Sequence, residues 1–252
     1  MRIDLNKEHR FAGLVLAGGR GSRFPSETGR IHPKVLRHAR GRPIIEYVLD
    51  ALETAGVDEI TLVVGYGAGE VQRVVGDRVQ YAHQHEQHGS GHAAKCAREL
   101  FQQYDGPLVV MCGDSPLFAA DTVRQLVKKH QSSEAAITLA SAMLDVPYGY
   151  GRILRSADGA IKGVVEEKCA NESQRQIREV NGGAYCFDAR WLYENIEKMA
   201  LNDAHEYNLT DMVRVAVEQD LTVSAVECDP RELLGVNTPE QLAAVEEILR
   251  IR

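Results

Sequence analysis

A glycine-rich segment near the start of the chain has the composition of a phosphate-binding loop. The run Leu16–Arg23 (LAGGRGSR) directly follows the apolar stretch Ala12–Ala17. Glycines let the backbone approach a phosphate closely and direct N–H groups at it. The guanidinium groups of Arg20 and Arg23 suit phosphate oxygens. Taken alone, the segment is compatible both with a phosphate loop and with an ordinary turn.

Two common nucleotide motifs do not fit this segment. A dinucleotide-binding GxGxxG motif would begin at Gly19, but its third glycine position holds Phe24. The acidic residue expected after the second strand is also missing, because that strand closes with Gly65. The Walker motif GxxxxGK[ST] is absent as well. The loop therefore belongs to neither of these two classes.

A lysine and an aspartate could complete a site for phosphate chemistry. Lys34 follows Pro33, eleven residues after Arg23, and Asp114 lies in Cys112–Pro116 (CGDSP) at the end of an apolar stretch. Transfer from a triphosphate needs positive charge at the reacting and leaving phosphates. An aspartate at the carboxyl edge of a parallel sheet suits Mg²⁺, although it could equally cap the helix that follows.

Histidines and cysteines offer weaker candidates for a site. His83, His85, His88 and His92 have a spacing that invites a zinc interpretation, but Glu86 stands alone and no set of four tetrahedral ligands is complete. We favour solvated imidazoles in a loop and at a helix start. The five cysteines are scattered and form no CxxC pair, which is typical of reduced thiols.

The elements that must hold these residues alternate between strand and helix in the first half of the chain. This order predicts a mostly parallel, doubly wound α/β sheet with helices on both faces. After about Glu134 the strand-like runs come closer together, which predicts a partly antiparallel second half. Strands are expected over Ala12–Ala17, Glu59–Val64, Arg78–Tyr81, Leu108–Cys112, Ala135–Ala142, Gly151–Arg155, Ala160–Glu166 and Asn181–Phe187. Helices are expected over Pro43–Ala55, Gly67–Val75, Gly91–Leu100, Ala120–His130, Ala189–Met199, Leu209–Asp220 and Pro239–Leu249.

Several segments resemble one enzyme family. The order of strand, GGxGxR and PK resembles the signature of sugar-1-phosphate nucleotidyltransferases. Further segments resemble the uridyltransferase domain of the GlmU family, the bacterial N-acetylglucosamine-1-phosphate uridyltransferases. They are Gln84–Ala93 (QHEQHGSGHA), Tyr148–Ile153 (YGYGRI), Val165–Gln176 (VEEKCANESQRQ), Glu179–Gly183 (EVNGG), Glu206–Asp211 (EYNLTD) and Gly235–Thr238 (GVNT).

The resemblance implies a Rossmann-like, doubly wound mixed sheet of the GT-A-like nucleotidyltransferase kind, with a partly antiparallel sugar-binding half. It implies transfer of a nucleotidyl group from UTP to a sugar 1-phosphate, N-acetylglucosamine 1-phosphate first, with Mg²⁺ as cofactor. Arg23 would hold the triphosphate and Lys34 the reacting phosphates. The nucleotide contacts would be Leu16, Ala17, Gly18, Gly19, Gly21, Ser22, Gln84, Gly89, Ser90 and Gly91, the last four at uracil. The sugar contacts would be Gly151, Glu166 and Asn181, and the Mg²⁺ ligands Asp114 and Asn237.

Four features depart from the family pattern. The loop Phe24–His32 is longer than usual, Gly182 replaces Thr or Ser, Asn208 replaces an aromatic residue, and Cys169 replaces aspartate. The chain ends near Arg252 with no β-helix repeat, so we expect no acetyl transfer. Alternatives are another nucleotide (dTTP, CTP or GTP), another sugar such as glucose or a heptose, or a non-catalytic regulator that binds nucleotide sugars.

Composition limits the setting of the molecule. The 252 residues predict one nucleotidyltransferase domain, with a nucleotide-binding half over about 1–116 and a sugar-binding half over 117–252. The net charge of −7 argues against a nucleic-acid partner. No stretch approaches the roughly 20 apolar residues of a membrane span, and no secretory signal is visible, so we expect a cytoplasmic protein without a membrane partner. The sequence leaves the oligomeric state open, a homo-oligomer included.

Overall fold

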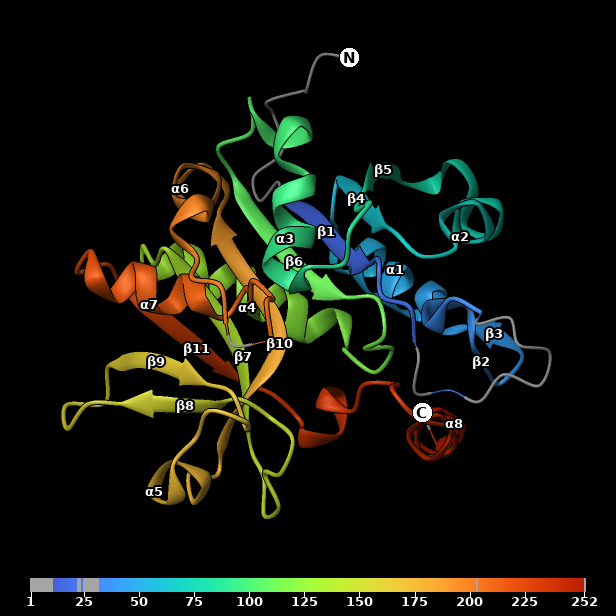
Figure 1. Ribbon diagram of the computed structural model, residues 1–252. Helices are drawn as coiled ribbons and strands as arrows, with labels where there is room; N and C mark the ends of the chain where they lie inside the picture. The colour runs from blue at the N-terminus through green and yellow to red at the C-terminus, as the bar shows by residue number, and fades with distance from the viewer. Residues whose placement is uncertain (1–10, 22–23, 25–31, 203, 252) are drawn as a thin grey trace.

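A single mixed sheet forms the centre of the computed structural model, which describes residues 11–21, 24, 32–202 and 204–251. Its strands are β1 (Ala12–Ala17), β4 (Glu59–Val64), β5 (Gln80–His83), β6 (Pro107–Cys112), β7 (Ile137–Met143), β8 (Arg152–Arg155), β9 (Ile161–Val165), β10 (Glu179–Asp188) and β11 (Val223–Glu227). Their order is β11-β7-β10-β6-β1-β4-β5, and β8 and β9 extend from β10 (Figure 1).

Strand directions agree with the predicted mixture of parallel and antiparallel pairs. β1 lies parallel to β4 and β6, and β4 lies parallel to β5. β10 runs antiparallel to β6, β7 and β8. The first half of the chain therefore builds the parallel part and the second half introduces the antiparallel pairs, which confirms the predicted fold class.

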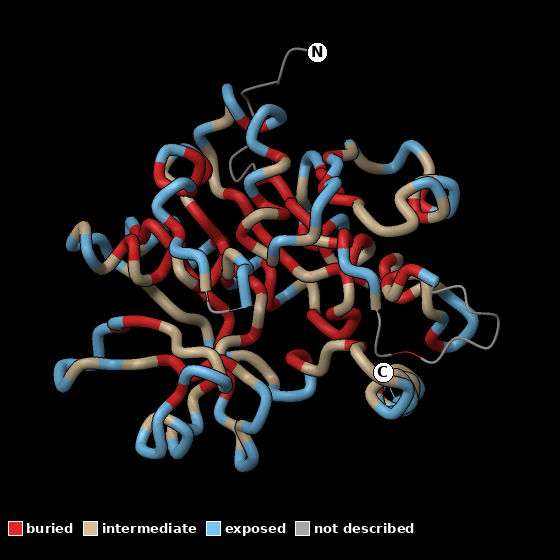
Figure 2. Tube along the Cα trace, viewed as in Figure 1, coloured by how far each residue is buried: buried red, intermediate tan, exposed pale blue. Residues whose placement is uncertain are grey.

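Helices cover both faces of the sheet. α3 (Gly89–Cys96), α6 (Ala189–Asn195) and α7 (Asp211–Glu218) share a hydrophobic cluster with Leu14. α1 (Ile44–Ala55), α2 (Ala68–Val75) and α4 (Ala120–Ser132) share another with Val15. Successive strand residues point to opposite faces, so these neighbours enter different layers. Buried residues concentrate along the central strands between the layers (Figure 2). No helix among the described residues combines the length and the apolar character that a membrane crossing requires.

The boundaries of α1 show how local sequence sets an element. Pro43 lies immediately before the first helical residue, where a missing N–H costs no helical hydrogen bond. Gly56 ends the helix with φ of 98°, a left-handed conformation that favours glycine. The predicted helix is confirmed with a start one residue later.

Other elements differ from the prediction. β5 begins two residues later than the expected strand at Arg78. α3 begins at Gly89 rather than Gly91 and ends at Cys96, because the chain continues as a 3₁₀ turn over Arg98–Phe101. Sequence patterns did not predict β11, the hairpin of β2 (His38–Ala39) and β3 (Arg42–Pro43), or α5 (Glu172–Arg175).

A third cluster joins the C-terminal helix to the region after Lys34. α8 (Pro239–Ile251) contributes Val245, which packs in one cluster with Phe24, Ala39 and Ile44. α8 also contacts β2. This packing brings the segment just before α8, which contains Asn237, back to the first half of the chain.

Candidate active site

A cleft of about 400 Å³ opens where β1, β5 and β6 end. The carboxyl ends of parallel strands meet at one edge of a sheet, which is the usual place for a ligand in such folds. Lining residues include eight of the predicted nucleotide contacts, namely Leu16, Ala17, Gly18, Gly19, Gly21, Gln84, Gly89 and Ser90. Lys34 and Asp114 line it too. Ser22 and Arg23 lie outside the described residues, so their predicted roles stay predictions.

The glycine loop is packed closely on two sides. A Cβ atom on Gly18 would lie 2.3 Å from Gln84 Oε1, and one on Gly65 would lie 2.7 Å from the Gly18 carbonyl oxygen. Gly21 has φ of 70°, and a Cβ atom there would lie 2.8 Å from Lys34 Cβ. The glycines at these positions therefore allow the loop to sit directly between Gln84 and Lys34.

Lys34 brings the two predicted metal ligands together. Its Nζ forms an ion pair with Asp114 Oδ2 and donates a hydrogen bond to Asn237 Oδ1 at 2.8 Å. The Lys34 and Asp114 side chains are each 16% exposed. The backbone N–H of Val236 donates to the Asp114 carbonyl at 2.8 Å, which ties the two acceptor segments together. Three segments distant in sequence thus meet at one point of the cleft.

The donor set at this point fits Mg²⁺. A carboxylate and an amide oxygen are hard ligands, and the Lys34 ammonium group shows that both oxygens can face a single cation. Within the described ranges no three His, Cys, Asp or Glu side chains are grouped for metal binding. Mg²⁺ usually keeps water and substrate phosphates as its remaining ligands, so two protein oxygens are sufficient.

Gln84 and the turn after it form another part of the cleft. Gln84 is 4% exposed, and its Nε2 donates to the Gly89 carbonyl at 3.1 Å. Ser90 Oγ accepts a hydrogen bond from the Leu209 N–H at 3.0 Å. Gly91 is buried, and its N–H donates to the Tyr207 carbonyl at 2.8 Å. Ser90 and Gly91 thus fasten this turn to the segment before α7.

The three predicted sugar contacts also lie together. A Cβ atom on Gly151 would lie 3.5 Å from Glu166 Oε2 and 3.7 Å from Asn181 Cβ. The Asn181 N–H donates to the Gly151 carbonyl at 2.8 Å. In the sheet Ala184 pairs with Met111, so Asn181 lies beside the end of β6 that carries Asp114.

Hydrogen bonds that the sequence did not predict hold the side chains of Glu166 and Asn181. Thr210 Oγ1 donates to Glu166 Oε1 at 2.9 Å, and Asn181 Nδ2 donates to the Tyr185 hydroxyl at 2.7 Å. Burial raises the pKa of Tyr185, which keeps its phenol neutral. Thr210 stands in the EYNLTD segment, so the motif offered a signal for it. Tyr185 could be found only from the register of β10.

A buried arginine supports the loop that contains Gly151. Arg152 is 2% exposed, and its Nη2 pairs with Glu167 Oε2 at 2.6 Å. Glu167 also accepts a hydrogen bond from the Gly149 N–H at 3.1 Å. The bond from Arg152 lowers the pKa of Glu167, followed by the bond from Gly149. This pair was not predicted, because the sequence marks neither residue as buried.

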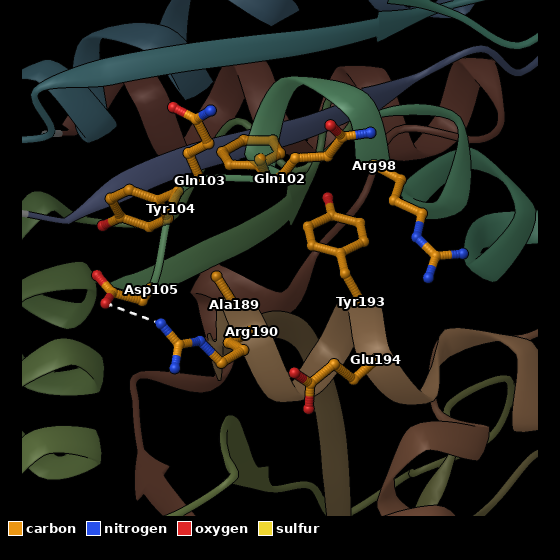
Figure 3. Close-up of a pocket in the computed structure, with 10 residues that line it drawn as sticks. Arg98, Gln102, Gln103, Tyr104, Asp105, Ala189, Arg190, Tyr193 and Glu194 are labelled. Atoms are coloured by element: carbon orange, nitrogen blue, oxygen red, sulfur yellow. Dashed lines mark hydrogen bonds and ion pairs between the residues drawn. The ribbon is translucent and has the colours of Figure 1, made fainter.

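A second hollow of about 290 Å³ lies between α6 and the segment before β6 (Figure 3). It is found at the amino end of β6, away from the edge where the cleft opens. Arg190 Nη2 pairs with Asp105 Oδ2 at 3.1 Å, and Arg98 pairs with Glu197 at 3.3 Å. It contains no glycine loop, lysine or metal-binding carboxylate pair among its described lining residues. The chemistry therefore points to the first cleft as the candidate active site.

Comparison with known proteins gives a family and a fold. The pattern of the nucleotidyl transferase family matches residues 12–230. The bifunctional protein GlmU of Clostridium novyi is 39% identical over 243 residues, covering 96% of this chain and 52% of the relative. The GlmU protein of Pelotomaculum thermopropionicum is 41% identical over 243 residues, with 96% and 52% covered. The chain thus spans about half the length of these relatives.

A solved structure with a similar fold comes from Bacillus anthracis and is described as a glucose-1-phosphate thymidylyltransferase. It superposes with a TM-score of 0.77 over 95% of each chain, at 17% sequence identity. At that identity the likeness concerns the fold alone.

Proposed function

This chain belongs to the nucleotidyl transferase family, and we propose that it joins UTP to N-acetylglucosamine 1-phosphate, forming a UDP-sugar and releasing pyrophosphate. The observation that carries the proposal is the contact of Lys34 with both Asp114 and Asn237 beside the glycine loop. One cation and two hard oxygen ligands at a cleft lined by a glycine loop are suited to triphosphate chemistry.

The reaction needs little covalent help from the protein. An oxygen of the sugar phosphate attacks the α-phosphorus of the triphosphate, and the bond from that phosphorus to the bridging oxygen breaks. Pyrophosphate leaves with the bridging oxygen. The second pKa of a phosphomonoester is about 6, so the nucleophile is largely dianionic at pH 7 and requires no general base.

Positioning and charge neutralisation are then the tasks of the chain. Lys34 places a positive charge at the reacting phosphates, and the N–H groups of the glycine loop bind phosphate oxygens. We assign Arg23 a similar role at the triphosphate from the family resemblance. Asp114 and Asn237 would hold Mg²⁺, which supplies positive charge to the triphosphate and to the leaving pyrophosphate when it is bound.

Two observations support the choice of substrates. Gln84 presents an amide in the cleft beside the glycine loop, which suits the imide edge of uracil. Gly151, Glu166 and Asn181 meet beside the end of β6, and their carboxylate and amide groups suit adjacent sugar hydroxyls. This arrangement supports the proposed division into a nucleotide-binding half over about 1–116 and a sugar-binding half over 117–252.

A pyrophosphate-release assay tests the proposal. UTP, dTTP, CTP and GTP are each combined with the 1-phosphates of N-acetylglucosamine and glucose, in the presence of Mg²⁺. We expect the highest kcat/KM for UTP with N-acetylglucosamine 1-phosphate. Turnover with dTTP and glucose 1-phosphate instead would transfer the assignment to a thymidylyltransferase. Binding of UDP-sugar without any turnover would identify a non-catalytic regulator.

A further inference from the structure

The orientation of the Gln84 amide is determined by its neighbours. Its Nε2 lies 3.1 Å from the Gly89 carbonyl oxygen and 3.2 Å from His92 Nδ1. A carbonyl oxygen can only accept a hydrogen bond, so the NH₂ group and not Oε1 must face Gly89. The reverse orientation would place two acceptor oxygens against each other.

The same geometry determines the protonation of His92. The second hydrogen of the Gln84 amide points to His92 Nδ1, which must therefore carry a lone pair. The ring proton then resides on Nε2, which lies 3.9 Å from Cys96 Sγ, a weak acceptor. A neutral ring with this tautomer satisfies both neighbours, and a protonated ring does not.

With its NH₂ group occupied, Gln84 directs its oxygen to the glycine loop. A Cβ atom on Gly18 would lie only 2.3 Å from Oε1. Within the described ranges Oε1 accepts no hydrogen bond. Gln84 therefore offers an acceptor to a ligand in the cleft. Uracil and thymine have a ring N–H that can donate to it, whereas the corresponding nitrogen of cytosine carries a lone pair that repels it.

We propose that His92 is a positioning residue for nucleobase selection: its Nδ1 lone pair holds the Gln84 amide with the oxygen toward the ligand, so that the cleft accepts imide bases and rejects cytosine. The inference rests on the proposed function, because it assumes that a nucleotide base binds beside Gln84. His92 itself belongs to α3 and does not line the cleft.

Protonation of His92 would reverse this preference. A hydrogen on Nδ1 would face the Gln84 NH₂ group, so the amide would turn or withdraw and the acceptor would be lost. The titratable and charged groups around the ring are His88, Glu86, Lys95 and Cys96. Burial first and then His88 lower the pKa of His92, and a hydrogen bond with the Glu86 backbone raises it in part. Lys95 lowers it further and the Glu86 charge raises it, and the net lowering keeps the neutral form dominant at pH 7.

Two substitutions separate a positioning role from a purely structural one. His92→Asn places an amide oxygen near the former Nδ1 and keeps an acceptor for Gln84, whereas His92→Leu keeps bulk without any acceptor. His85→Asn is the matched control, because His85 is exposed and no hydrogen bond joins its side chain to that of Gln84 among the described residues. The measured quantity is kcat/KM for UTP divided by kcat/KM for CTP, since effects shared by the triphosphates cancel in this ratio.

We expect His92→Leu to lower the UTP-to-CTP ratio about tenfold, the scale of one buried hydrogen bond that is lost. His92→Asn and His85→Asn should leave the ratio within about threefold of the original protein, on the same scale. Because the pKa of His92 is lowered, mainly by burial, the ratio should fall in the original protein only at a pH below the ordinary imidazole range. It should stay flat in His92→Asn, which has no titrating group at this position. An unchanged ratio in His92→Leu would overturn the inference, as would an original protein that does not discriminate UTP from CTP.

A measurement that does not depend on turnover tests this inference independently of the proposed function. The ¹⁵N chemical shifts of the His92 ring in the intact protein should show a protonated Nε2 and an unprotonated Nδ1, and a protonated Nδ1 would refute the mechanism. If no pyrophosphate is released, calorimetry gives the dissociation constants of UTP and CTP, and their ratio replaces the ratio of kcat/KM values. If the protein shows this tautomer and prefers UTP in binding but releases no pyrophosphate, only the proposed function is wrong. If the protein turns over but its UTP-to-CTP ratio does not change in His92→Leu, only the inference about His92 is wrong.

Discussion

At the scale of single residues, the ammonium group of Lys34 is the feature on which the proposed chemistry depends. Replacing Lys34 by Ala removes the positive charge from the point where Asp114 and Asn237 meet. We expect kcat to fall by about 10²–10³, the range seen when one preorganised charge-stabilising group is deleted. Pyrophosphate release at saturating substrates measures this effect, and circular dichroism checks the fold.

Lys95→Ala is the matched control for this substitution. Lys95 is an exposed lysine that pairs with Glu197 on the surface, so its removal should leave kcat unchanged. A Lys34→Ala protein with a rate as high as that of Lys95→Ala would contradict the assigned role.

Gly18 and Gly19 provide a second contrast between neighbouring residues. A methyl group on Gly18 would collide with Gln84 Oε1 at 2.3 Å, whereas a methyl group on Gly19 would meet no atom within 4 Å. We expect Gly18→Ala to reduce the free energy of unfolding by about 1–3 kcal/mol, the usual cost of overpacking, and to raise the KM for UTP. Gly19→Ala should leave the free energy of unfolding within about 0.5 kcal/mol of its original value. Denaturant titration compares them, and equal losses in both would exclude the steric explanation.

The residues that meet in the candidate site could be predicted from sequence where a motif carried its own chemistry. Lys34, Asp114 and Asn237 were chosen by residue type and resemblance, and the structure brings them into contact. Tyr185 and Arg152 could not be found in this way. Their partners are set by strand register and by loop packing, which a single sequence does not display.

At the scale of elements, the segment before α7 joins the two ends of the site. Its Tyr207 N–H donates to the His88 carbonyl at 2.8 Å, and its Leu209 N–H donates to Ser90 Oγ at 3.0 Å. At the other end Thr210 Oγ1 donates to Glu166 at 2.9 Å. One short segment therefore contacts the turn after Gln84 and the predicted sugar carboxylate, which couples their positions.

Thr210→Val tests the sugar end of this segment. Valine has almost the same shape but no hydroxyl, so Glu166 loses the donor that orients it. We expect the KM for the sugar phosphate to rise several-fold, consistent with about 1 kcal/mol for one hydrogen bond, while the KM for UTP stays unchanged. Initial-rate measurements with each substrate varied separately provide both constants.

Thr54→Val is the control for this element, because Thr54 is exposed near the end of α1 and does not line the cleft. Equal increases of both KM values in Thr210→Val would indicate general loosening and not the loss of a specific sugar contact.

Elements with strong terminal signals were the easiest to predict. α1 has proline before its first residue and glycine after its last one, and both ends were located to within a residue. β11 was missed because its sequence VSAVE does not alternate strictly between apolar and polar residues. It is an edge strand paired only to β7 among the described strands, so its residues are half-buried and its apolar signal is weak.

At the scale of the whole molecule, one continuous sheet connects the proposed nucleotide end to the proposed sugar end. β6 and β10 lie side by side in its centre, so Asp114 after β6 and Asn181 at the start of β10 are held by the same hydrogen-bonded frame. α4 packs against β6, β7, β10 and β11, and thus supports both halves. Changes that weaken the packing of α4 should therefore affect the stability of the molecule as a unit.

His130 on α4 makes this stability sensitive to acid. The side chain is 6% exposed and lies 3.3 Å from Thr138 Oγ1 of β7. Burial lowers the pKa of His130 from 6.5 to about 4, partly offset by Asp188. Above pH 6.5 the imidazole is neutral in both the folded and the unfolded chain, so it does not affect the pH dependence. Between pH 6.5 and about 4 the unfolded chain binds a proton that the folded chain excludes, so the free energy of unfolding falls as pH falls.

The full loss amounts to about 3 kcal/mol for a shift of this size. Denaturant titrations at pH 7.5 and pH 4.5 should show most of this loss in the original protein and a smaller one in His130→Phe/Thr138→Val, which removes the imidazole together with its hydroxyl partner. Titrating carboxylates act on both proteins alike and cancel in the difference. Parallel pH profiles for the two proteins would mean that His130 is protonated in the folded core, and α4 would then have to open toward solvent to accommodate the charge.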